Sequence, residues 1–260
     1  MRIALGVEYD GAPFCGWQTQ PEGCGVQDYL EKALAQLTQH EVQIVAAGRT
    51  DTGVHALSQV VHFDTETERP LSAWVRGVNA HLHPSVRVLW AHEVNVEFHA
   101  RFSARGRHYQ FVLYNSPVAS AVMAEKASWF HLPLDVEKMA DGAKFLEGEH
   151  DFSAFRAAEC QAKSPVRTLY EATVKKYGDY IVFNFSGNAF LHHQVRNMVG
   201  ALIYVGKGSF EPDHIQTLLQ QRDRTISPPT FSPDGLYLTG VDYEPHWGLP
   251  VSRRRLAFFA

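Results

Sequence analysis

The sequence predicts an α+β fold with a mainly antiparallel sheet flanked by helices, in which two similar halves share one central sheet. Short segments with alternating apolar and polar residues recur along the 260-residue chain, as is typical of strands in antiparallel sheets. Segments with apolar residues at helical spacing lie between them. No stretch is long or polar enough for a flexible linker, so we expect the two halves to be joined through one sheet.

The first half, residues 1–100, begins with a strand. Ile3, Leu5 and Val7 alternate with smaller or polar residues, and the pattern breaks at Asp10-Gly11-Ala12-Pro13. Apolar residues at helical spacing then predict a helix from Val26 to about residue 37. The other elements expected in this half are strands around 42–46 and 59–64, a helix through 71–78 and a strand near 86–94.

The second half, residues 101–245, repeats this order of elements, and residues 246–260 form a tail. It opens with a strand at 107–114, and a helix follows Asp135, a residue type that favours helix N-termini. The other expected elements are a hairpin of 168–176 and 180–186 around Gly178-Asp179, helices at about 190–205 and after Pro212, and a strand at 235–243.

Composition and cysteine usage predict a cytoplasmic protein with no membrane segment. The chain is 45% hydrophobic and 20% charged, and no run approaches the roughly 18 apolar residues of a membrane helix. Glu8 is too close to the N-terminus for a signal peptide. The cysteines Cys15, Cys24 and Cys160 are odd in number and form no C-x-x-C pair, so we expect reduced thiols rather than a disulfide framework or a zinc site.

Charge is unevenly distributed along the chain. Residues 1–100 contain 6 Lys/Arg and 12 Asp/Glu, whereas residues 101–260 contain 18 and 16, and the whole chain has a formal net charge of −4. Basic residues cluster at Arg101/Arg105/Arg107, Arg222/Arg224 and Arg253/Arg254/Arg255. Such clusters indicate either a basic groove or solvated surface arginines.

The segment with the most reactive groups is the loop between Gly48 and Gly53. It contains Arg49, Asp51 and two threonines, and glycines on both sides permit tight turns and close approach of a ligand. This pattern predicts a functional loop. The alternative is a structural turn in which Asp51 accepts hydrogen bonds from nearby N–H groups.

Two further residues are candidates for a site. Arg196 lies at the edge of the apolar stripe of the predicted helix 190–205, where a partly desolvated guanidinium would require a carboxylate partner. Tyr109 lies on the same face of its predicted strand as the apolar residues. It is therefore either a site residue or a tyrosine of the core.

Several common chemistries lack support, and we predict neither a metal nor a cofactor. His81-x-His83 and His192-His193 have no third ligand at a recognisable spacing, and no H-E-x-x-H occurs. Phosphate-loop, dinucleotide-binding and G-x-S-x-G motifs are also missing.

Six motifs follow one another in order over nearly the whole chain. They are residues Gly11–Gln20, Gly48–Ala56, His99–Arg105 leading to Tyr109, Gly148–Arg156, Phe190–Gly200 and Gly235–Leu238. Any one of them alone is weak evidence, but the series is specific, and it resembles the TruA family of tRNA pseudouridine synthases. Two departures are Thr52, where the family usually has Ala, and the stretch 228–234, which differs from the family's usual short Ala/Pro-rich approach to Gly235-Leu236.

The resemblance implies the pseudouridine synthase fold and an isomerase that needs no cofactor. In this reaction the C1′–N1 bond of a uridine breaks and the uracil rejoins through C5. The resemblance assigns Asp51 as the nucleophile or base, whether it attacks C1′ or acts through a glycal intermediate. It further implies that Arg196 pairs with Asp51, Tyr109 stacks on the uracil, Leu236 lines the base pocket and Arg49 fills the gap left by the flipped nucleotide.

The resemblance also implies a partner and an assembly. The substrate would be the anticodon stem-loop of tRNA at positions 38, 39 and 40, bound by a homodimer. One alternative is an RNA-binding protein of the same fold without isomerase activity. Another is a glycoside hydrolase, which needs two carboxylates close together, and Asp51 has no evident second carboxylate in the motifs.

Overall fold

The structure is a computed structural model that describes residues 1–256, and it divides into two compact units. The first unit contains residues 1–105 and 237–255, and the second contains mainly residues 106–236. The chain leaves the first unit within β5 (Ala104–Asn115) and returns to it at the start of β10 (Leu236–Tyr243). The boundary predicted at residue 100 therefore lies slightly too early, and most of β10, which we placed in the second half, lies in the first unit.

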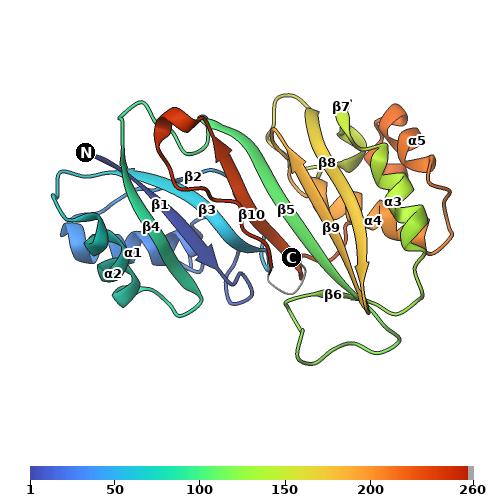
Figure 1. Ribbon diagram of the computed structural model, residues 1–260, viewed down its shortest axis with the longest axis horizontal. Helices are drawn as coiled ribbons and strands as arrows, with labels where there is room; N and C mark the ends of the chain where they lie inside the picture. The colour runs from blue at the N-terminus through green and yellow to red at the C-terminus, as the bar shows by residue number, and fades with distance from the viewer. Residues whose placement is uncertain (257–260) are drawn as a thin grey trace. The chain divides into compact units, whose positions relative to one another are not determined.

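The first unit is a sheet with two helices, and Figure 1 shows α1 and α2 beside strands β1, β3 and β4. The strand order is β4-β1-β3-β10, with β2 also paired to β3. β1 is antiparallel to both neighbours, whereas β10 is parallel to β3. The further bounds are β1 (Arg2–Tyr9), α1 (Val26–Thr38), β2 (Val45–Ala46), β3 (His55–Asp64), α2 (Leu71–His81) and β4 (Val86–Val94).

Packing explains these elements. The predicted stripe of α1 is buried, including Leu30 and Leu34 at 0% exposure, so the helix forms because its apolar face joins the core. On α2, Trp74 packs edge-on against Phe63 of β3, with 5.4 Å between ring centroids. β1 is buried on both faces over most of its length, which is more than its alternating pattern predicted.

The second unit combines strands with three helices. β5, β9, β8 and β7 are paired in that order by antiparallel ladders, and β6 runs parallel to β5. The predicted hairpin is confirmed, because Tyr177 and Tyr180 form the last pair around Gly178-Asp179. The bounds are β6 (Ser128–Phe130), α3 (Val136–Lys144), β7 (Gly148–Asp151), β8 (Val166–Tyr177), β9 (Tyr180–Gly187), α4 (Gln194–Gly206) and α5 (His214–Gln221).

The central helix α4 begins later than predicted. His193 precedes it in the left-handed region, with φ of 61°, and this conformation cannot continue a helix backward. Phe190 and Leu191 therefore lie outside the helix, which corrects the predicted start at residue 190. From Gln194 onward nearly every side chain of α4 is buried.

The predicted class, α+β with a mainly antiparallel sheet and helices between the strands, is confirmed. That the two halves share one central sheet stays a prediction. Within residues 1–256, no helix has the length and apolar character needed to cross a membrane.

Candidate active site

The loop that carries Asp51 connects β2 to β3 in the first unit. The N–H of Val54 donates to the carbonyl oxygen of Asp51 at 3.1 Å, and Gly53 has a φ of 81°. A turn with positive φ at its third residue favours glycine, which explains Gly53. At the other end, the buried side-chain amide of Gln59 donates to the carbonyl oxygen of Gly48 at 2.7 Å. Asp51 itself is half-buried and Arg49 is exposed.

The motif Gly11–Gln20 packs directly against this loop. A Cβ atom at Gly16, where φ is 88°, would lie 2.9 Å from the carbonyl oxygen of Thr50, and one at Gly11 would lie 2.0 Å from that of Val54. The N–H of Trp17 donates to the carbonyl oxygen of Thr50 at 3.0 Å. Only glycine leaves room for the loop at these two positions, so this motif fixes the backbone on both sides of Asp51.

Two buried side-chain contacts reinforce the loop. The hydroxyl groups of Tyr9 and Thr50 form a hydrogen bond of 2.8 Å, and Thr50 directly precedes Asp51 in the chain. His55 accepts a hydrogen bond at Nδ1 from the N–H of Gly11 at 3.0 Å and stacks on Tyr237, with 4.6 Å between ring centroids. Burial, together with the charge of Asp10, raises the pKa of the Tyr237 phenol.

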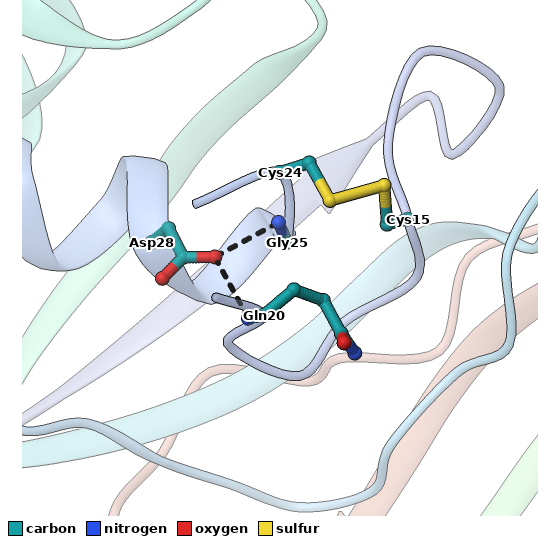
Figure 2. Close-up of a disulfide and its surroundings, with 5 residues drawn as sticks. All are labelled: Cys15, Gln20, Cys24, Gly25 and Asp28. Atoms are coloured by element: carbon teal, nitrogen blue, oxygen red, sulfur yellow. Dashed lines mark hydrogen bonds between the residues drawn. A yellow bond between two sulfur atoms is a disulfide. The ribbon is translucent and has the colours of Figure 1, made fainter. Parts of the chain in front are cut away.

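The prediction of reduced thiols is wrong for two of the three cysteines. Cys15 of the motif Gly11–Gln20 forms a disulfide with Cys24, four residues beyond it, as Figure 2 shows, whereas Cys160 is free and buried. Their Cα atoms lie 5.4 Å apart, a usual separation for a disulfide. The chain turns back between them, and the Asp28 carboxylate accepts hydrogen bonds from the N–H groups of Gly25 and Gln20 at the start of α1.

Tyr109 lies on β5 in the second unit and is half-buried, between the fully buried His108 and Gln110. Its ring meets that of Phe190 edge-on, with 5.0 Å between centroids. A Cβ atom on Gly187 would lie 2.8 Å from the carbonyl oxygen of Thr168, so the backbone of β8 requires glycine there, and it would be in ordinary contact with the ring of Phe190 at 3.4 Å. Tyr109 is therefore not the fully buried core tyrosine of the alternative interpretation.

Arg196 and Leu236 also lie in the second unit. Arg196 is half-buried on α4, as predicted, and its Nε donates to the carbonyl oxygen of Phe231 at 2.8 Å. Leu236 is 4% exposed at the start of β10. The divergent stretch before it is held in place, since Ser128 donates its hydroxyl to the carbonyl oxygen of Asp234 at 2.5 Å.

The five residues predicted to form the site therefore fall into two groups. Asp51 and Arg49 share one loop of the first unit, and Tyr109, Arg196 and Leu236 belong to the second. Sequence analysis missed the support given by Tyr9 and Phe190. Their sequence signal is only an aromatic residue at the end of a strand and another just before a helix, which is common in any core.

Comparison with known proteins shows the family of this chain. A family model described as tRNA pseudouridine synthase matches residues 6–103 and 143–244, stretches that contain Asp51, Arg196 and Leu236. The chain belongs to the tRNA pseudouridine synthase family.

Relatives named tRNA pseudouridine synthase A align with nearly the whole chain. The protein of Methylobacillus flagellatus is 64% identical and the alignment covers 98% of each chain. The protein of Dechloromonas aromatica is 56% identical over 96% of this chain and 95% of its own. The protein of Thiobacillus denitrificans is 53% identical over 99% of both chains.

A chain in a solved Cbf5-Nop10-Gar1 complex aligns with 91% of this chain and 48% of its own length, with a TM-score of 0.36 and 13% identity.

Proposed function

We propose that this protein is an isomerase that converts uridine to pseudouridine in tRNA. The observation that carries the proposal is the placement of a half-buried carboxylate, Asp51, in a loop whose backbone is fixed on both sides, in a chain of the tRNA pseudouridine synthase family. Fixed geometry matters because a carboxylate can attack or deprotonate a sugar only from a defined position. Relatives of 53–64% identity carry the name of this activity.

Each candidate residue has a role in the proposal. Asp51 is the nucleophile or base, and Arg196 acts on its carboxylate. The half-buried ring of Tyr109 stacks on the uracil, and Leu236 lines the base pocket. The exposed guanidinium of Arg49 occupies the space left by the flipped nucleotide, since a planar cation can stack on bases and contact phosphate.

The reaction needs no oxidant or reductant and transfers no group to another molecule, so the proposal includes neither a cofactor nor a metal. The C1′–N1 bond breaks, C1′ bonds to C5, the C5 hydrogen leaves as a proton, and N1 gains a proton, so substrate and product have the same composition. We further propose that the substrate is the anticodon stem-loop at positions 38, 39 and 40, that the enzyme acts as a homodimer, and that it works in the cytoplasm. The family resemblance supports these finer points.

The test uses tRNA labelled with tritium at C5 of uridine, because the new C1′–C5 bond expels that hydrogen. The wild-type protein should release tritium. Asp51→Asn should lower the rate by about 10³-fold or more, since it removes the nucleophile or base while conserving volume, and tRNA affinity should change less than about threefold. Asp179→Asn, an exposed carboxylate in the β8–β9 turn, is the matched control and should keep full activity.

Tritium release by Asp51→Asn at a rate close to that of wild type would reject the role of Asp51. Binding of tRNA by the wild-type protein without any release would instead identify an RNA-binding protein of this fold without isomerase activity.

A further inference from the structure

Three arginines lie at one end of the sheet in the second unit. Arg107 of β5 and Leu169 of β8 both lie opposite Gly187 of β9, so they occupy one cross-strand row. Arg167 precedes Leu169 by two residues, and side chains two apart on a strand share a face. Asn188 links the two strands: it receives a hydrogen bond at its carbonyl oxygen from Arg107 at 2.8 Å, and its N–H donates to the carbonyl oxygen of Thr168 at 3.0 Å.

The third arginine, Arg156, comes from the loop before β8. Its Nη2 donates to the carbonyl oxygens of Cys160 and Ala162 at 2.5 and 3.0 Å. Arg167 likewise uses backbone acceptors, the carbonyl oxygens of Ser164 and Val166, through Nη1. All three arginines are half-buried.

Neither Arg156 nor Arg167 has a carboxylate partner among residues 1–256. Carbonyl oxygens orient a guanidinium without neutralising its charge. The Nε of Arg167 is moreover buried and makes no hydrogen bond within the described part of the chain. Buried donors in native structures nearly always have a partner, so an unmatched one in a charged group points to a missing acceptor.

The electrostatics of the cluster agree with this. Burial lowers the pKa of Arg167; Cys160 raises it, and the like charges of Arg156 and Arg107 lower it further. The pKa of the Cys160 thiol is lowered as well, which favours its charged form. Burial raises the pKa of its thiol, but hydrogen bonds from the N–H groups of Ala162 and His192 and the charge of Arg156 outweigh burial and lower it. The cluster therefore favours an anion, and a phosphate matches the fork of donors on a guanidinium.

The position of the cluster relates it to the candidate site. Arg107 and Tyr109 are two residues apart on β5, on the same face and about 7 Å apart along the strand. We propose that Arg107, Arg156 and Arg167 bind a backbone phosphate of the RNA substrate, next to the nucleotide whose base lies on Tyr109. This inference rests on the proposed function for the identity of the ligand. The site orients the strand without selecting its sequence, because phosphate contacts position a nucleic acid whereas base contacts specify it.

The experiment pairs protein variants with RNA that lacks one charge. A tRNA is ligated from fragments, with a single neutral methylphosphonate at each backbone position around the modified uridine in turn. Binding is measured by fluorescence anisotropy for wild type, Arg167→Gln and Arg156→Gln. Lys176→Gln, an exposed lysine at the other end of β8, is the matched control.

We expect one methylphosphonate position to weaken wild-type binding by about tenfold, as for a charge-assisted contact. The same replacement should change binding to Arg167→Gln or Arg156→Gln by less than about twofold, because the contact is already lost. With unmodified tRNA, both variants should raise KM about tenfold and leave kcat within about threefold. Arg167→Lys keeps the charge but loses the fork, and it should recover part of the affinity.

A variant that unfolds would be recognised from its thermal transition. The binding measurements would then be made with the other arginine variant. The phosphate site would be overturned if, at every backbone position, the methylphosphonate weakened binding to both arginine variants as much as it weakens binding to wild type. This outcome would leave the proposed function intact if wild type releases tritium normally. Conversely, coupling at one position without tritium release would support the site and reject the isomerase. The control lysine variant should show no coupling at any position.

Discussion

At the scale of single residues, His62 shows how burial fixes a protonation state. It lies on β3 and is 4% exposed, and its Nδ1 accepts a hydrogen bond from the N–H of Ala100 at 3.1 Å. Burial lowers its pKa to about 4, and the charges of Arg2 and His99 contribute. The neutral ring joins β3 to the segment that leads into the second unit, so protonation would break a structural contact.

This gives a pH-dependent stability with a defined sign. The folded pKa of about 4 lies below the unfolded value of 6.5, so the unfolded state binds more protons in between. Stability should be full above pH 6.5 and fall as the pH drops toward 4. From pH 7.5 to 5.0 this one residue should cost about 2 kcal/mol, because each unit of pKa difference corresponds to about 1.4 kcal/mol.

Urea unfolding at the two pH values checks this for wild type and His62→Asn, whose side-chain oxygen can still accept the Ala100 N–H. The variant should lose about 2 kcal/mol less than wild type over the same interval. An equal loss in both proteins would show that His62 does not titrate in this range.

At the scale of elements, the Cys15–Cys24 disulfide closes the turn that packs on the Asp51 loop. The two cysteines are nine positions apart, and closing a loop of that length stabilises the folded state by about 2–3 kcal/mol. Cys15 is exposed, so a thiol reductant can reach the bond. Backbone hydrogen bonds also hold the turn, including the one from the N–H of Cys15 to the carbonyl oxygen of Cys24 at 3.0 Å. The turn should therefore persist in a reducing compartment, with lower stability.

Reductant should lower the unfolding free energy of the wild-type protein by about 2–3 kcal/mol without unfolding it at room temperature. A Cys15→Ser, Cys24→Ser double variant should show the lower stability with or without reductant. Cys160→Ser, which leaves the bond intact, should keep the response. Identical unfolding curves for wild type in both conditions would contradict a contribution from this bond.

The elements that sequence analysis predicted well are those whose signal is local. The pattern of α1, the extent of β4 and the turn of the β8–β9 hairpin follow from spacing and turn residues alone. The two short strands β6 and β7 were missed, because three or four residues carry no periodicity. The late start of α4 depends on the left-handed backbone of one histidine, which no pattern of apolar residues encodes.

The candidate site shows the same division. Asp51 and Arg49 stand out because reactive residues between two glycines are unusual in sequence. The arginine cluster was not predicted, because it joins segments that only the fold brings together. The disulfide was missed because an odd number of cysteines without a C-x-x-C pair favoured reduced thiols. Arg156 and Arg167 are separated by ten residues of loop and strand, and Arg107 comes from a different strand altogether.

At the scale of the whole molecule, the structure changes the distribution of charge that the sequence indicated. Arg253, Arg254 and Arg255 belong to the first unit, although they come at the end of the chain. The first unit contains 11 Lys/Arg and 14 Asp/Glu, and the second contains 13 Lys/Arg and 14 Asp/Glu. Neither unit is basic overall. Arg254 is also partly neutralised, because its guanidinium pairs with the Glu8 carboxylate. Contacts to RNA must therefore come from local clusters rather than from the field of a basic body.

The salt dependence of tRNA binding should distinguish arginines that contact phosphate from arginines, such as Arg254, that already pair with a carboxylate. Each phosphate contact adds about 0.7–0.9 to the slope of log affinity against log salt concentration, because it releases condensed counterions. Replacing both Arg156 and Arg167 by Gln should make the slope shallower by about one, as expected for one lost phosphate contact. Arg254→Gln removes a charge that already has a carboxylate partner, so the slope should stay as in wild type. Titrations between about 50 and 200 mM salt measure both. If the Arg254 variant lost as much slope as the double variant, net charge rather than the arginine cluster would govern binding.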